Sequence, residues 1–391
     1  MVGARNVTRR WLSALGLAAA LVAGCTTSAS RSTGSATTST PTTGPTTITG
    51  ATGPTVVVSS LPAGCDGGVP PANDVLTFVT QGRAWAMAPG DGASVRCLFP
   101  ISNSGLWSWG PRGDRVVLDG LEVRGVGTSL SRPAANLSPS YYSWSRPTGT
   151  TVVFTDQSQK NLLRADLGYG GTQDITPVPG ATYGDIAYHP SGLAIAFVAT
   201  PPGGTPAIWI STNTGQQARQ IVTAQDAGTT FGHIVFAHDG TGLYYSVDTA
   251  AGSHTLARFD LTTGAVVTSL WSGAAPIDDI TELAAVPGVA ITVGAACTDR
   301  RAVFSALDGT AGQILAPGVP GPVSVVGRLD ADRFIVAAGG CNGSPADLYL
   351  VHRSGAAPAV IVRGVDASAM RTPEPTPPPP LPVNLPQSAH G

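Results

Sequence analysis

The stretch IAYHPSGLAIAF at residues 186–197 decides the fold, because it places a tight-turn sequence between two short apolar segments. Histidine, proline, serine and glycine form the turn, and an aromatic residue, Tyr188, ends the first apolar segment. This pattern predicts a β-hairpin. Related phrases occur as WSWGPRGDRVVL at 107–118, YSWSRPTGTTVVF at 142–154 and IVFAHDGTGLYY at 234–245. The hairpin is therefore a repeating unit.

The spacing of these copies indicates the architecture. Their aromatic residues lie 35, 44 and 48 residues apart, at Trp109, Trp144, Tyr188 and Phe236. Internal repeats of this length are typical of propeller blades. Two more diverged units follow at 288–309 and 332–351, with Cys297 and Cys341 in matching places.

An incomplete first unit at 76–99 is expected to share its blade with a strand from the C-terminal end near residue 366. Closing the ring in this way removes the exposed sheet edges that favour aggregation. We predict an all-β fold, a β-propeller over residues 65–368. Seven blades are favoured and six are the alternative.

The repeated phrase also carries a family resemblance. An aromatic residue followed by Ser-Pro-x-Gly and then by three apolar residues resembles the repeat of TolB-type propellers, a WD40-like class of bacterial envelope proteins. The turn is degenerate here, reading Gly-Pro-Arg-Gly, Ser-Arg-Pro-Thr-Gly, His-Pro-Ser-Gly and His-Asp-Gly in the four copies. The resemblance covers nearly the whole middle of the chain and implies interaction rather than catalysis.

The N-terminus has the layout of an export signal. Residues 1–24 contain a basic start with Arg5, Arg9 and Arg10, an apolar run too short to span a bilayer well, and small residues before Cys25. The sequence LVAGC at 21–25 resembles the lipobox of bacterial lipoproteins, which implies lipidation of Cys25. We therefore expect a lipid-anchored protein on the extracytoplasmic face of the cell membrane; an ordinary secretory signal with a chance cysteine is the alternative.

Two low-complexity segments flank the expected propeller. Residues 25–60 are almost wholly Ser, Thr, Gly, Ala and Pro, and contain too little apolar surface to offset the entropy of ordering, so we expect a flexible linker. Residues 369–391 are rich in proline and are expected to be an extended, disordered tail outside the fold. This tail is interpreted as a spacer, with a docking peptide for a partner as the alternative.

Four cysteines remain beside Cys25. An even number in an exported protein suggests disulfides, and four cysteines allow three connectivities. We favour Cys65 with Cys97 and Cys297 with Cys341. The close C-x-x-C spacing of metal and redox sites is absent from the sequence.

The sequence contains no recognised motif for a nucleophile elbow, a zinc protease, a phosphate loop or a calcium loop. We therefore predict no catalytic residues, no metal site and no cofactor. Polar residues just before the innermost strands could line one mouth of the channel, although ordinary solvation of loops is the favoured interpretation. The candidates for this binding rim are Asp185, His233, Asp278 and Asp279.

Charge excludes one class of partner. Without the three leader arginines, 19 Lys and Arg residues face 24 Asp and Glu residues, a net charge of −5, so no basic stripe is expected to track nucleic acid. We expect a monomeric, non-catalytic binding or scaffolding module for an envelope protein, peptide or glycan. The alternatives are a lyase or hydrolase with a site at the channel mouth, and a sensor accessory to a membrane signalling partner.

Overall fold

The computed structural model describes most of the chain after residue 60. The described residues are 61–65, 67, 75–89, 95–101, 108–112, 115–118, 122–125, 131–133, 141–168, 170–282, 288–308, 312–371, 378–382 and 385. The predicted signal, Cys25 and the linker lie outside them. In this part of the chain, no helix combines the length and the apolar character needed to cross a bilayer.

The described strands form seven four-stranded antiparallel sheets. The first sheet has the spatial order β28 (Ala367–Met370), β1 (Leu76–Thr80), β2 (Arg83–Met87) and β3 (Val95–Pro100). The second contains β4 (Ser108–Trp109), β5 (Arg115–Leu118), β6 (Glu122–Gly125) and β7 (Ser131–Pro133). The third contains β8 (Tyr142–Trp144), β9 (Thr151–Thr155), β10 (Leu162–Asp166) and β11 (Thr172–Asp174).

The remaining four sheets have strands of five to eight residues, apart from the two-residue β23. They contain β12 (Thr182–Tyr188), β13 (Ala194–Thr200), β14 (Ala207–Thr212) and β15 (Arg219–Thr223); then β16 (Thr230–Phe236), β17 (Gly242–Asp248), β18 (His254–Asp260) and β19 (Val266–Gly273). The last two contain β20 (Ile277–Glu282), β21 (Gly288–Val293), β22 (Arg301–Ala306) and β23 (Gln313–Ile314), and β24 (Val323–Arg328), β25 (Arg333–Gly339), β26 (Ala346–His352) and β27 (Ala359–Val365). Two short 3-10 helices, η4 (Cys297–Asp299) and η5 (Cys341–Gly343), lie in the β21–β22 and β25–β26 loops.

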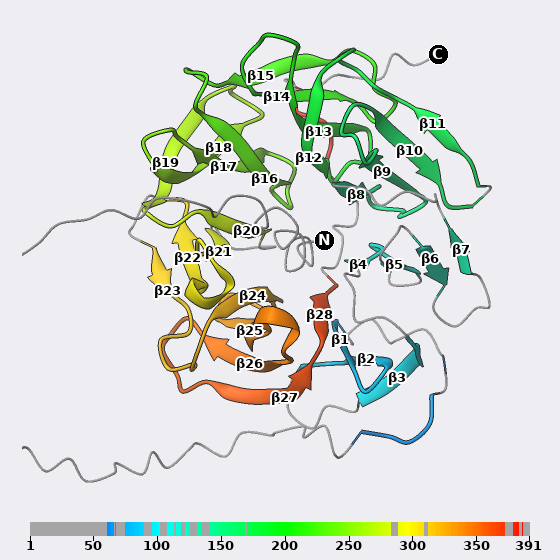
Figure 1. Ribbon diagram of the computed structural model, residues 1–391, viewed down its shortest axis with the longest axis vertical. Helices are drawn as coiled ribbons and strands as arrows, with labels where there is room; N and C mark the ends of the chain where they lie inside the picture. The colour runs from blue at the N-terminus through cyan, green and yellow to red at the C-terminus, as the bar shows by residue number, and fades with distance from the viewer. Residues whose placement is uncertain are drawn as a thin grey trace, which may run out of the picture.

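Figure 1 shows these sheets arranged around a common centre, which confirms the predicted all-β propeller. Six of the sheets are established as propeller blades, and six is the blade count that the sequence analysis gave as the alternative. The favoured count of seven stays a prediction. Its support is the β4–β7 sheet, whose strands contain only two to four residues each.

Each sheet buries its apolar side chains against its neighbours. Ile208 and Ile210 of β14 share one apolar cluster with Ile234 and Phe236 of β16 in the next sheet. The first strands of successive sheets contact one another, as β12 does with β16 and β16 with β20, so these strands are the innermost. The core is therefore a ring of apolar layers between blades.

The first blade is completed from both ends of the domain. Strand β1 pairs antiparallel with β28, from Leu76 opposite Met370 to Val79 opposite Ala367. The hydroxyl of Thr77 donates to the carbonyl of Ala369 over 2.8 Å. This confirms that a C-terminal strand near residue 366 shares the blade of the first unit.

The turns of the repeated phrase at 186–197 and 234–245 connect two neighbouring blades. The ring of His189 is fully buried, and its Nε2 lies 3.0 Å from the carbonyl oxygen of Gly240 in the turn of the next blade. The backbone N–H of Ser191 donates to Nδ1, which leaves Nε2 as the protonated nitrogen that donates to Gly240. Gly240 has φ +71°, and a Cβ there would lie 2.7 Å from this Nε2. Glycine at this position meets both the backbone and the packing requirement.

The buried histidine makes stability dependent on pH. Burial, together with the charge of Arg146, lowers the pKa of His189 from 6.5 to about 4. The folded state favours the neutral imidazole. The contribution of His189 to the free energy of unfolding is therefore fully present above pH 6.5 and is lost as the pH falls from 6.5 towards 4. We expect this loss to reach up to about 3 kcal/mol, and His189→Gln to flatten the slope of unfolding free energy in that window.

The measurement is urea unfolding of wild type and variant at several pH values between 4 and 7.5. His254→Gln, which leaves His189 in place, is the control and should keep the wild-type slope. Equal slopes for wild type and His189→Gln would show that His189 is not the titrating group. Carboxylates with lowered pKa values, such as Asp330 and Asp332, also reduce the free energy of unfolding as the pH falls, and they do so equally in every variant.

Candidate functional site

The innermost strands of four successive sheets share a β-bulge. The pairing with the second strand shifts register between Tyr183 and Ile186, Gly232 and Val235, Ile277 and Asp279, and Val325 and Gly327. Asp185, His233 and Asp278 lie within three of these bulges, and Asp279 directly follows the third. A bulge interrupts the hydrogen-bond ladder and re-aims a side chain. The structure thus places the four predicted rim residues at corresponding points of consecutive blades.

Asp185 serves the scaffold. Its side chain is buried, and its Oδ1 accepts the backbone N–H of Ile186 over 2.9 Å. Its Oδ2 accepts the backbone N–H of Ile234, which lies in the bulge of the next blade, also over 2.9 Å. One carboxylate therefore ties two innermost strands together and satisfies an N–H group that a bulge takes out of the ladder.

The same kind of link recurs elsewhere in the ring. The hydroxyl of Ser143 on β8 accepts the backbone N–H of Tyr188 on β12 over 3.1 Å. Thr292 on β21 likewise accepts the backbone N–H of Val325 on β24 over 3.0 Å. In each case a side-chain oxygen of one blade binds the innermost strand of the next.

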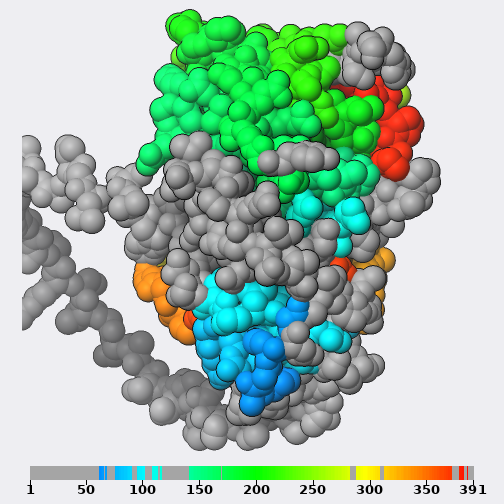
Figure 2. All heavy atoms as spheres, turned by 90° about the vertical axis from the view of Figure 1, so that its right-hand side faces the viewer, coloured from blue at the N-terminus to red at the C-terminus, as the bar shows by residue number. Residues whose placement is uncertain are grey.

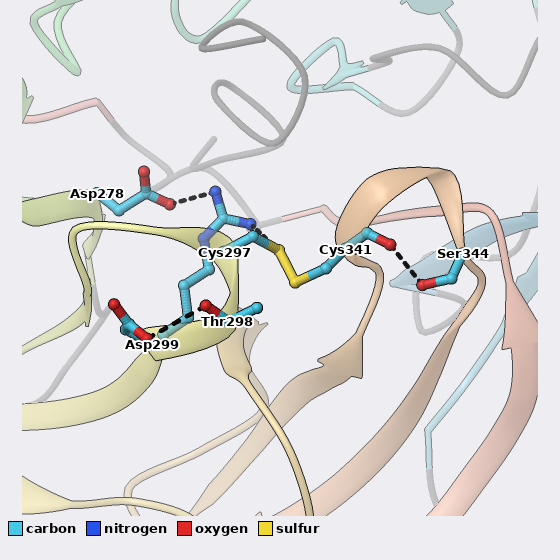
Figure 3. Close-up of a disulfide and its surroundings, with 7 residues drawn as sticks. Asp278, Cys297, Thr298, Asp299, Cys341 and Ser344 are labelled. Carbon is cyan, nitrogen blue, oxygen red and sulfur yellow. Dashed lines mark hydrogen bonds and ion pairs between the residues drawn. A yellow bond between two sulfur atoms is a disulfide. The ribbon is translucent and has the colours of Figure 1, made fainter. Parts of the chain in front are cut away.

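Asp278 is buried in an ion pair that the sequence analysis missed. Its Oδ2 lies 2.8 Å from Nη2 of Arg300, and the two side chains are only 12% and 9% exposed, respectively. Nη1 of Arg300 donates to the sulfur of Cys297 over 3.5 Å. The guanidinium therefore lies between Asp278 and the disulfide, which are labelled in Figure 3. The backbone carbonyl of Arg300 also accepts the N–H of Val323, at the start of β24.

One disulfide lies beside Arg300, and a second lies at the start of the domain. Cys297 is bonded to Cys341, so that the loops carrying η4 and η5 in adjacent sheets are joined (Figure 3). Cys65 is bonded to Cys97 on β3. Both preferred pairings are confirmed. The interblade disulfide joins residues 44 positions apart in the sequence, and the sulfur of Cys297 accepts the hydrogen bond from Arg300.

His233 and Asp279 differ from the two buried carboxylates. Both residues are half-buried, so part of each remains accessible from outside. His233 adopts φ +46°, a left-handed conformation that is uncommon for residues other than glycine, asparagine and aspartate. The structure therefore divides the predicted rim: Asp185 links two blades and Asp278 forms an ion pair within its own sheet, whereas His233 and Asp279 are partly exposed.

Other histidines form pairs with carboxylates near the ends of strands. Nδ1 of His254 lies 2.6 Å from Asp248, and Nδ1 of His352 lies 2.7 Å from Asp332. Neither pair includes a rim residue. Within the ranges that the structure describes, no group of three His, Cys, Asp or Glu side chains is placed to hold a metal ion.

Comparisons with known proteins address the fold. No family model matches the chain, and no curated protein matches it. Among solved structures, TolB from Acinetobacter baumannii aligns over 76% of this chain and 81% of its own, with 14% identity and a TM-score of 0.46. The neighbours thus include the family that the repeat resembles.

Two enzymes are similar in fold as well. An oligogalacturonate lyase in complex with manganese aligns over 69% of this chain and 82% of its own, with 14% identity and a TM-score of 0.50. A puromycin-hydrolyzing peptidase from Mycobacterium tuberculosis aligns over 76% of this chain, with 15% identity and a TM-score of 0.51. This chain aligns with 55% of that peptidase. Such likeness shows the propeller fold alone, and a fold does not select a function.

The buried ion pair yields a prediction about stability. Asp278→Ala leaves the guanidinium of Arg300 buried without its carboxylate, and we expect a loss of about 3–5 kcal/mol in unfolding free energy. The double variant Asp278→Leu with Arg300→Met removes both charges and should recover much of this loss.

The exposed pair of Arg363 and Asp347 is the matched control, because the side chain of Arg363 is 56% exposed. Arg363→Ala should change the unfolding free energy by less than about 1 kcal/mol. Chemical denaturation of the four proteins provides the measurement. A double variant as unstable as Asp278→Ala would contradict the assignment of the loss to an unpaired charge.

Proposed function

We propose that the chain is a lipid-anchored binding module on the extracytoplasmic face of the cell membrane, whose propeller recognises an envelope protein, peptide or glycan. The observation that carries this proposal is the division of the rim. Buried carboxylates at two of the bulges, Asp185 and Asp278, bind other parts of the scaffold, while His233 and Asp279 remain partly accessible at the neighbouring positions. A rigid frame with a few accessible polar groups suits recognition, because little entropy is lost when a partner binds.

A lyase or hydrolase site is the alternative, and the two buried carboxylates weigh against it. General acid or base catalysis needs a carboxyl group within reach of the substrate proton. Asp185 binds two backbone N–H groups, and Asp278 binds Arg300. Using Asp185 in catalysis would require breaking a link between two blades, and using Asp278 would leave the buried guanidinium of Arg300 without its carboxylate.

The anchor makes a first prediction. Cells given an alkyne analogue of palmitate should label the full-length chain, and Cys25→Ala should abolish the label and release the protein from the membrane fraction, because anchoring depends on the acyl chains. Thr26→Ala is the adjacent control and should behave as wild type. Membrane retention and labelling of Cys25→Ala would exclude Cys25 as the attachment site.

The rim makes a second prediction, tested by crosslinking in intact cells followed by affinity capture. His233→Asn keeps a side chain that tolerates the left-handed backbone but removes the imidazole, so recovery of the partner should fall several-fold with little change in stability. His254→Asn, which changes a histidine away from the innermost strands, should leave recovery unchanged. Recovery of no partner, together with turnover of an envelope glycan by the purified chain, would favour the enzyme instead.

A further inference from the structure

Part of the proline-rich tail lies on the propeller. Leu385 is only 4% exposed and belongs to the apolar cluster between the β12–β15 and β16–β19 sheets. Leu381 packs against the same cluster. Figure 2 shows red C-terminal residues against the green sheets. The expectation of a tail outside the fold is therefore corrected for this segment.

The tail also meets the turn that locks these two blades. A Cβ built on Gly240 would lie 3.2 Å from Cγ of Pro379, so this proline sits directly over the glycine that accepts the His189 hydrogen bond. This turn joins the first and second strands of its sheet. The loops that carry Cys297 and Cys341 join second and third strands, at the opposite end of the antiparallel strands. The tail contact is therefore separate from the disulfide and the ion pair beside it.

The chemistry of the tail fits a recognised peptide. The sequence PPPPLPVNLP at 377–386 has no charge, and its prolines favour an extended conformation that loses little entropy on binding. The backbone N–H of Leu385 donates to the carbonyl of Pro382 over 3.0 Å. Burying two leucine side chains would contribute on the order of 3–6 kcal/mol before the entropy cost of ordering.

We propose that this surface, the tail site, is a binding site for proline-rich peptides that carry two leucines four residues apart. The tail site consists of the Gly240 turn and the apolar cluster that contains Leu385. The chain's own tail is its resident ligand, and a partner protein with a segment of the same chemistry binds by displacing it. This inference goes beyond the proposed function, since it concerns a different end of the strands and a defined peptide class.

The tether explains why the resident tail competes well. Arg371 is buried, and its backbone N–H donates to the carbonyl of Val75, so the chain is fixed up to that point. Six residues then connect it to Pro378. A short connection gives the tail an effective concentration in the millimolar range at its own site. A free peptide must compete with the tail at about that concentration.

The test uses the full chain and a fluorescent peptide of residues 376–388. The variant Leu381→Asp with Leu385→Asp is designed to vacate the tail site, because a charged carboxylate is costly to bury in an apolar cluster. By fluorescence anisotropy, we expect the peptide to bind this variant at least about tenfold more tightly than wild type, in which the tail occupies the site. A control peptide with alanine at both leucine positions should bind neither protein. His233→Asn should bind the peptide as wild type does, which separates this site from the rim.

Several outcomes would overturn the proposal. They are a failure of the peptide to bind the double variant when its circular dichroism is that of wild type, equal affinity for both proteins, or binding of the alanine peptide. A concentration-dependent wild-type dimer in light scattering would assign the site to the tail of a second copy. Should the double variant not fold, Leu381→Ala alone is used: an affinity above that of wild type supports the proposal, and an unchanged affinity overturns it.

Discussion

A four-stranded sheet of this kind has two faces and cannot bury either by itself, so its stability depends on the sheets beside it. Closure of the ring is the constraint that follows. The pairing of β1 with β28 meets it with a backbone ladder between residues 76–79 and 367–370, nearly 300 positions apart in the sequence. Because this ladder joins the two ends of the domain, the last blade cannot move from the first without losing main-chain hydrogen bonds.

Within this ring, several buried polar side chains connect one blade to the next. The turn histidine His189 donates to Gly240, and Asp185 accepts the N–H of Ile234. The Cys297–Cys341 disulfide crosses to the following sheet, and beside it Asp278 binds Arg300 within one sheet. Such contacts are directional, so they fix the angle between blades more sharply than apolar packing does. A binding surface built on this frame would owe its shape to these links.

The sequence was informative wherever one unit contains the whole signal. Each hairpin has its own turn glycine and apolar segments, so the blades and the closing strand could be predicted. The disulfides could be preferred because Cys297 and Cys341 lie in matching places of two repeats. The role of Asp185 could not be predicted, because its partner is a backbone group in the next blade. Arg300 was missed for the same reason: its spacing from Asp278 becomes meaningful only once β20 and the β21–β22 loop lie side by side.

Composition misled in the tail. A run of prolines predicts exclusion from a core because proline has no N–H to contribute to a sheet. This argument holds for the backbone: Pro378, Pro379, Pro380 and Pro382 cannot join a ladder. It does not apply to side chains, and two leucines are enough to reach an apolar cluster. The tail segment thus differs from β28, a few residues earlier, which is held by backbone pairing with β1. A contact made by side chains, without a ladder, can be released without disturbing the strands beneath it, and it is therefore the part of the C-terminal region best suited to exchange with another chain.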